Sequence, residues 1–189
     1  RTQHIARAKA EGIPLTMLTA YDALTAPILE AAGVDMLLVG DSLGNVILGH
    51  SSTLPVTLED MERATAAVAR STSRAMIVAD LPFGTYEDTV EHAFASAARL
   101  MKAGAHAVKL EGGRSRAHII AGLVSAGIPV CAHLGYTPQS ENTLGGPRMQ
   151  GRGAGADALR RDAEAVEQAG AFAVVFEMVP ASIATELTQ

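Results

Sequence analysis

The stretch AGAHAVKLEGG, residues 103–113, shows the pattern that decides the fold. An Ala-Gly pair ends a segment with helical periodicity, and the apolar run Ala107–Leu110 that follows is expected to form a short buried strand. That run contains Lys109 and is followed at once by Glu111, so charged side chains stand where the strand ends. The pattern predicts a helix that ends at a glycine, then a strand, then a polar loop.

The same unit recurs along the chain. Ala-Gly pairs precede four predicted strands, at residues 32–33, 103–104, 126–127 and 169–170. The predicted strands are Leu15–Thr19, Met36–Val39, Ala75–Ala79, Ala107–Leu110, Val130–Ala132 and Ala173–Phe176. The predicted helices are Ala23–Ala32, Leu58–Ser71, Tyr86–Ala103, Ser115–Ala126, Ala156–Ala169 and one that starts after Pro180. In the helix over residues 86–103, the spacing predicts one apolar stripe, which consists of Val90, Phe94, Ala97 and Met101.

The strands are continuously apolar, which is typical of a parallel sheet covered on both faces. Six βα units fit either a doubly wound sheet or part of a (β/α)₈ TIM barrel, and the pattern alone does not separate these α/β folds. The polar residues at the strand ends favour the barrel. We expect residues 1–189 to form a single barrel domain with about six βα units that lacks its last two.

Composition excludes several classes of protein. Hydrophobic residues make up 48% of the chain and charged residues 19%, which suits a folded domain with a buried core. A net charge of −5 and few aromatic residues argue against nucleic-acid binding. No apolar stretch is long enough to span a membrane, so we expect a soluble cytoplasmic protein. Cys131, the single cysteine, lies in an apolar run and is expected to be a buried hydrophobe. Because the chain starts without methionine and ends inside a predicted helix, we expect it to be part of a longer protein.

Five consecutive predicted strands lead into ionisable residues at their carboxyl ends. These residues are Asp41 (followed by Ser42), Asp80, Lys109 with Glu111, His133, and Glu177. In a (β/α) barrel, the loops at that end of the strands build the active site. The pattern therefore predicts that these side chains share one site.

Three of these residues, Asp41, Asp80 and Glu111, offer only oxygen ligands, which suit Mg²⁺ better than Zn²⁺. Glu111 could equally be a supporting or capping residue. Lys109, among acids, is expected to stay charged and to hold a substrate anion rather than form a Schiff base.

His133 could bind metal, contact the substrate, or be a buried core residue whose hydrogen bonds are made within the protein, and a hydrogen bond to substrate is favoured. Glu177 follows an apolar run, where a desolvated carboxylate suits a general base.

Seven motifs, in order, resemble the ketopantoate hydroxymethyltransferase family of (β/α)₈ barrels in the phosphoenolpyruvate/pyruvate class. They are MLTAYD (17–22), VGDSLG (39–44), TLPVT (53–57), ADLPF (79–83), VKLEGG (108–113), HLGYTPQS (133–140) and QGRG (150–153). The resemblance implies a transferase of pantothenate biosynthesis that uses Mg²⁺. It would move a hydroxymethyl group from 5,10-methylenetetrahydrofolate to 3-methyl-2-oxobutanoate, giving 2-dehydropantoate.

The resemblance also assigns roles to residues. It implies that Asp41, Asp80 and Glu111 hold or support the metal, and that Glu177 is the catalytic proton acceptor. Substrate contacts fall to Asp41, Ser42, Asp80, Lys109 and His133. The resemblance also implies that this protein forms a homo-oligomer, a homodecamer by family analogy. A C–C lyase of the isocitrate-lyase-like branch is a rival, but the Lys-Lys-Cys-Gly-His type motif of that branch is absent. A non-catalytic binding protein is the other rival, and the presence together of Asp41, Asp80, Lys109 and Glu177 argues against it.

Overall fold

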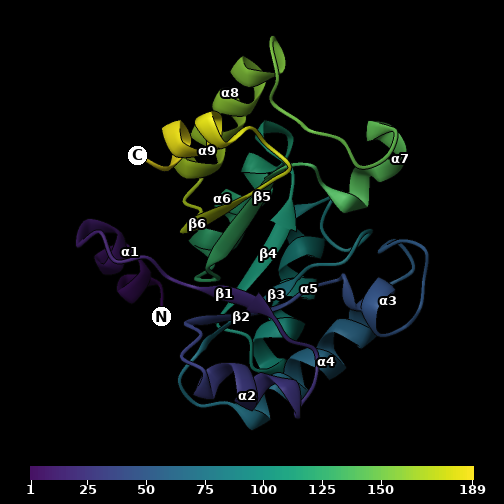
Figure 1. Cartoon of the computed structure of the whole chain (residues 1–189). Coiled ribbons are helices and arrows are strands. Elements are labelled where there is room, and N and C mark those ends of the chain that lie inside the picture. Colours follow the sequence, from purple (N-terminus) through teal and green to yellow (C-terminus); the bar gives the residue numbers. More distant parts are fainter.

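The computed structural model describes residues 1–189, which form one six-stranded parallel sheet (Figure 1). The strands are β1 (Met17–Thr19), β2 (Met36–Val39), β3 (Met76–Asp80), β4 (Ala107–Glu111), β5 (Val130–Gly135) and β6 (Ala173–Glu177). Their order in the sheet, β1 to β6, follows the chain. A doubly wound sheet reverses its strand order at a switch point, whereas a barrel adds each strand beside the one before. The order confirms the barrel expectation: the chain forms a partial (β/α) barrel.

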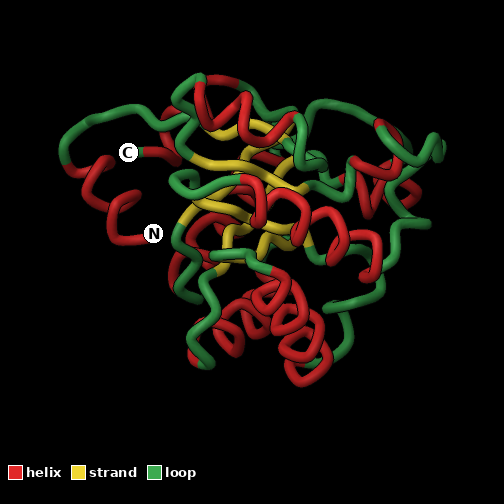
Figure 2. The backbone as a smooth tube through the Cα atoms, turned by 90° about the horizontal axis from the view of Figure 1, so that it is seen from below, coloured by secondary structure: helices red, strands yellow, loops and turns green.

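The helices are α1 (Thr2–Ala10), α2 (Thr25–Ala31), α3 (Leu43–Val46), α4 (Leu58–Ser71), α5 (Val90–Ala103), α6 (Ala117–Ser125), α7 (Glu141–Leu144), α8 (Gly155–Gln168) and α9 (Ala181–Thr188), with 3₁₀ turns η1 (Arg114–Arg116) and η2 (Pro138–Ser140). The longer helices α4, α5, α6 and α8 pack on the outer face of the sheet, whereas Ile5 of the N-terminal helix α1 packs against the inner cluster, and α3 and α7 are single turns near the strand ends (Figure 2). The six predicted helices are all present. The sequence did not predict α1, α3 and α7, because α3 and α7 are single turns and α1 buries only Ala8. No helix combines the length and the apolar character needed to cross a bilayer.

Alternation along the strands separates two packing surfaces. Outward residues, such as Leu37, Ile77 and Leu110, join the large core shared with the helices. Inward residues form a small second cluster in the barrel interior, made of Met76, Val78, Ala107 and Cys131. Successive side chains of a strand point to opposite faces. The inward set therefore continues, two residues at a time, into Asp80, Lys109, Glu111, His133 and Glu177 at the barrel mouth.

The strands run farther than predicted, by one residue in β3, β4 and β6 and by three in β5. Asp80, Glu111, His133 and Glu177, which were expected just after strands, are therefore part of them, whereas Asp41 and Ser42 follow β2 as expected. Asp80 pairs with Lys109 across β3 and β4, and Glu111 pairs with His133 across β4 and β5. Because the partner side chains have opposite charge or can hydrogen-bond, the ladder continues past the apolar run.

The predicted helix ends are confirmed. Of the predicted apolar stripe of α5, Ala97 is buried and Val90 and Met101 pack against the core, whereas the prediction is wrong for Phe94. The glycines of the four Ala-Gly pairs all have positive φ angles of 96°, 116°, 85° and 93° in chain order. In α5 the buried residues are Ala93, Ser96, Ala97 and Leu100. Phe94 is 44% exposed. Small residues let α5 lie close to its neighbours, so the helix turns its bulkier Phe94 outward.

Candidate active site at the barrel mouth

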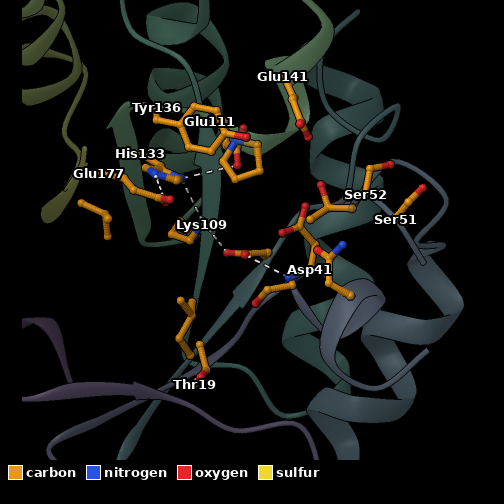
Figure 3. Close-up of a pocket in the computed structure, with 17 residues that line it drawn as sticks. Thr19, Asp41, Ser51, Ser52, Lys109, Glu111, His133, Tyr136, Glu141 and Glu177 are labelled. Atoms are coloured by element: carbon orange, nitrogen blue, oxygen red, sulfur yellow. Dashed lines mark hydrogen bonds and ion pairs between the residues drawn. The ribbon is translucent and has the colours of Figure 1, made fainter. Parts of the chain in front are cut away.

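A hollow of about 350 Å³ lies at the carboxyl ends of the strands (Figure 3). All seven residues that the sequence singled out line it: Asp41, Ser42, Asp80, Lys109, Glu111, His133 and Glu177. They come from five consecutive strands or the turns directly after them, β2 to β6. The alternation that fills the barrel interior with apolar side chains thus also delivers the charged ones to one place.

Lys109 and Asp80 form a buried ion pair at the centre of the hollow. The Lys109 Nζ lies 2.9 Å from Asp80 Oδ1, and both side chains are at most 5% exposed. Burial opposes the charge on Lys109, but the carboxylates of Asp80 and Glu111 outweigh it and raise the pKa of the ammonium. A protonated lysine holds anions and is a poor Schiff-base nucleophile.

Asp41 lies beside this pair. Its backbone N–H donates to Asp80 Oδ2 over 3.1 Å, which brings the end of β2 against the end of β3. Burial, together with the negative charge of Asp80, raises the pKa of the Asp41 carboxyl to about 7. Two buried acids placed so closely repel each other when both are ionised.

His133 connects the central acids to Glu177. Its Nδ1 lies 3.4 Å from Glu111 Oε1, and its Nε2 lies 3.1 Å from Glu177 Oε2. Burial and the charge of Lys109 oppose protonation of the imidazole, but the carboxylates of Glu111 and Glu177 outweigh them and raise the pKa of His133. The expectation of a desolvated Glu177 is wrong in this structure, since its side chain is 42% exposed. The missing cover follows from the position of β6 at an edge of the sheet.

Four polar residues of the site had no predicted role. Gln139 donates its side-chain amide to Asp41 and its backbone N–H to Glu111, and Tyr86 donates to Gln139. Tyr21 O–H and Ser42 Oγ are 2.9 Å apart. The hydroxyl of Thr53 lines the hollow and has no hydrogen-bond partner although it is buried. Three of them, Tyr21, Thr53 and Gln139, fall inside the quoted motifs, which is the one signal that pointed to them.

The acids fit a hard divalent cation such as Mg²⁺. No three His, Cys, Asp or Glu side chains close around one point as a complete metal cage. Mg²⁺ does not need one, because it commonly takes one or two carboxylates and keeps waters or substrate oxygens as its other ligands. Asp80 Oδ1 faces the Lys109 ammonium, whereas Asp41 Oδ1 has no hydrogen bond within the chain, and burial next to Asp80 raises the pKa of Asp41. Glu111 differs from Asp41, because both its oxygens face partners, Gln139 and His133.

Comparison with known proteins places the chain in a family. A family model described as ketopantoate hydroxymethyltransferase matches residues 1–189. The chain belongs to the ketopantoate hydroxymethyltransferase family. A 3-methyl-2-oxobutanoate hydroxymethyltransferase of Corynebacterium efficiens is 58% identical over 189 residues, which cover 100% of this chain and 70% of that protein. The protein of the same name from Leifsonia xyli subsp. xyli is 56% identical and is matched over 69% of its length by all of this chain.

Solved structures extend this family assignment to the fold. A phosphonopyruvate hydrolase in complex with oxalate and Mg²⁺ superposes with a TM-score of 0.72 at 17% identity, covering 93% of this chain and 62% of that one. A 2,3-dimethylmalate lyase of the PEP mutase/isocitrate lyase superfamily also gives 0.72, at 18% identity, covering 98% of this chain and 64% of that one. This chain therefore shares its partial barrel with the fold of these enzymes, and it spans less than two thirds of either structure.

Proposed function

We propose that this chain carries the active site of a 3-methyl-2-oxobutanoate hydroxymethyltransferase. The reaction transfers the one-carbon unit of 5,10-methylenetetrahydrofolate to 3-methyl-2-oxobutanoate and gives 2-dehydropantoate, a precursor in pantothenate biosynthesis. In this reaction, C3 of the substrate loses a proton and bonds to the methylene carbon. The bonds from that carbon to the folate nitrogens break, and water supplies the hydroxyl oxygen.

One observation carries the proposal. Buried acids with an associated lysine occupy the floor of the hollow, while a more exposed carboxylate, Glu177, stands at its rim against His133 (Figure 3). A 2-oxo acid offers two kinds of group to such a site, an oxygen-rich end and an acidic C–H. The names of the relatives supply the identity of the acid, and the charge layout supports the way it is held.

The floor of the hollow suits the oxygen-rich end of the substrate. Asp41 and Asp80, supported by Glu111, would hold Mg²⁺, and the bound cation would supply Lewis-acid stabilisation of negative charge on the substrate oxygens. The Lys109 ammonium lies beside Asp80 and would attract the substrate carboxylate. The Ser42 hydroxyl, held by Tyr21, would orient the same end of the substrate. Fixing the substrate in this way points its C3–H bond at a base.

The rim of the hollow suits proton transfer. Glu177 is exposed enough to meet a substrate and lies 3.1 Å from His133 Nε2. We assign it the removal of the C3 proton. The raised pKa of His133 favours its charged form, which would hold the Glu177 carboxylate in place and keep it ionised. With Nδ1 facing Glu111 and Nε2 facing Glu177, His133 would act through Glu177 rather than donate to the substrate itself.

The activity can be tested directly. The full-length protein is incubated with 3-methyl-2-oxobutanoate, 5,10-methylenetetrahydrofolate and Mg²⁺, and 2-dehydropantoate is measured by mass spectrometry. We expect product with Mg²⁺, none after treatment with EDTA, and recovery when Mg²⁺ is added back. Absence of product under all conditions would refute the proposal. Activity that survives EDTA, with borohydride trapping of the 2-oxo acid on Lys109, would instead show Schiff-base chemistry.

We also propose that the protein acts as a homo-oligomer, a homodecamer by analogy with its family. Several apolar side chains on and around α2 and α3 are exposed to solvent: Leu24 (77%), Ile28 (63%), Val46 (66%) and Ile47 (56%). Apolar groups gathered on a surface are common where subunits meet. Analytical ultracentrifugation of the full-length protein measures the assembly directly, and a monomer at micromolar concentration would contradict this proposal.

A further inference from the structure

The buried pair Gln139 and Tyr86 links the strand ends that carry the acids of the site. Gln139 belongs to the turn η2 after β5, and Tyr86 precedes α5. Their side chains are 8% and 2% exposed. A buried amide needs partners for its oxygen and for both its N–H bonds. Gln139 finds them on Leu81, the residue after β3, on Asp41, two residues after β2, and on Tyr86.

The hydrogen bonds allow only one orientation of the Gln139 amide. Its Nε2 donates to Asp41 Oδ2 over 2.8 Å and to the Leu81 carbonyl over 3.0 Å, and its Oε1 accepts from the Tyr86 hydroxyl over 2.6 Å. Turning the amide over would place its oxygen against two other oxygens. Tyr86 also accepts the backbone N–H of Glu111 over 3.2 Å, and its O–H proton has the much nearer acceptor in Gln139 Oε1 at 2.6 Å than in the Glu111 carbonyl at 3.3 Å.

We infer that Gln139 is a positioning residue that aims Asp41 at the bound cation and holds the supporting Glu111 in place, with Tyr86 fixing its orientation; the inference rests on the proposed function. Gln139 Nε2 holds one oxygen of Asp41, and the other, Oδ1, has no hydrogen bond within the chain. The backbone N–H of Gln139 holds Glu111 Oε2 over 3.0 Å. One residue thus sets the rotation of two carboxylates that come from different strands.

A network of this kind increases the affinity of the site for a cation, in addition to any effect on the stability of the fold. A carboxylate that rotates freely must lose that freedom when it binds a cation, whereas one already held by a second residue has lost it on folding. Removing a residue that orients a metal ligand in this way typically weakens metal affinity about 10–100-fold. Because Gln139 lies behind the acids, it would act without touching the substrate.

The test measures binding of Mn²⁺, a paramagnetic substitute for Mg²⁺, by electron paramagnetic resonance on the full-length protein. Gln139→Met keeps the length of the side chain and removes its hydrogen bonds, and its Mn²⁺ dissociation constant should rise about 10–100-fold. Tyr86→Phe should raise the constant in the same direction by a smaller factor. Gln168→Met is the matched control, since Gln168 lies exposed on α8 and bonds only Glu164, and it should leave the constant unchanged.

The kinetics separate positioning from damage to the fold. In Gln139→Met the Mg²⁺ concentration for half-maximal activity should rise with the dissociation constant, while kcat at saturating Mg²⁺ changes less. If Gln139→Met does not fold, as judged by near-UV circular dichroism, Tyr86→Phe decides. An unchanged dissociation constant in a folded variant overturns the inference, as does a wild-type protein that binds no Mn²⁺. If the variants bind Mn²⁺ more weakly but the wild-type protein makes no 2-dehydropantoate, the inference is upheld and the proposed function is refuted.

Discussion

At the scale of single residues, Glu177 combines a fixed backbone with an accessible side chain. Its carbonyl accepts the N–H of Tyr136 over 2.8 Å, and the next residue, Met178, has a φ angle of 48°, unusual for a residue other than glycine. A side chain on Gly135 would place its Cβ 2.2 Å from the Glu177 carbonyl oxygen, so only glycine fits there. Strain held in this way is typical of functional positions.

Glu177→Gln should separate chemistry from binding. Glutamine keeps the size and hydrogen bonding of the side chain but cannot accept the C3 proton. We expect exchange of that proton of 3-methyl-2-oxobutanoate into D₂O, followed by NMR, to fall about 10²–10⁴-fold. Binding of Mn²⁺ and of the 2-oxo acid should persist, because Asp41, Asp80 and Lys109 are unchanged. Normal exchange in the variant would assign the proton to another residue, and loss of substrate binding would make Glu177 a ligand-holding residue.

The site residues differ in how well the sequence could predict them. Asp41, Asp80, Lys109, Glu111 and His133 are charged or ionisable residues at the ends of apolar runs, where an unpaired charge would be costly, so their presence alone predicts a site. Gln139 gives no such signal, because a neutral amide in a loop is ordinary. Its bond to Asp41 spans 98 positions of the sequence and exists only once the strands are in order. The exposure of Glu177 likewise depends on which elements cover β6.

His106 holds the start of β3 in place, because its Nδ1 accepts the backbone N–H of Ile77 over 2.9 Å. Desolvation by the surrounding chain lowers the pKa of His106 below its usual 6.5. A folded-state pKa below the unfolded one means that protonation favours unfolding. The contribution of His106 to stability should be fully present above about pH 6.5 and lost as the pH falls towards its folded pKa.

Urea unfolding of the wild type and of His106→Gln tests this between pH 7.5 and 5. The glutamine does not titrate and can still accept a hydrogen bond. The difference in unfolding free energy between the two proteins should shift against the wild type as the solution becomes acidic. Parallel curves would show that the Ile77 bond does not depend on the protonation of His106.

At the scale of elements, α4 begins with a complete capping box. The Thr57 hydroxyl accepts the N–H of Asp60 over 3.1 Å, and the Asp60 carboxylate accepts the N–H of Thr57 over 3.1 Å. Thr57→Ala leaves the N–H of Asp60, in the first turn of the helix, without its partner. We expect the free energy of unfolding to fall by about 1 kcal/mol, measured by urea denaturation. Thr143→Ala, in the exposed turn α7, removes the same atoms where no cap exists, and an equal loss there would contradict the explanation.

The elements themselves were largely predictable, because continuous apolar runs and Ala-Gly pairs report local requirements of strands and helix ends. Strand ends were not. β5 runs through Gly135 because Gly135 pairs with Glu177 on β6, and a pattern in one segment cannot show a partner in another. The position of Phe94 in α5 was unpredictable for the same reason. Because α4 packs closely against α5, only small side chains such as Ala93 and Ala97 fit between the two helices, and Phe94 faces solvent.

At the scale of the whole molecule, the sequential strand order brings the acids together. Asp41, Asp80 and Glu111 follow or end β2, β3 and β4, which are neighbours in the sheet. These acids have no common site in the unfolded chain, so a cation that binds them stabilises the folded sheet as a unit. The gain in stability is RT ln(1 + [L]/Kd), about 2.7 kcal/mol when the cation is present at 100 times its Kd.

The melting temperature of the full-length protein should therefore rise with MgCl₂ and not with NaCl of equal ionic strength. Asp41→Asn removes one ligand charge but can still accept the hydrogen bond of Gln139, so its Mg²⁺-induced rise should be much smaller. Without divalent cations and above pH 7, Asp41→Asn should melt at a higher temperature than the wild type, because the pKa of about 7 means that ionising Asp41 beside Asp80 costs stability in the folded protein. Equal Mg²⁺ responses in the two proteins would place the cation elsewhere. A wild type more stable than Asp41→Asn in EDTA would show that Asp41 is held by its neighbours rather than strained by them.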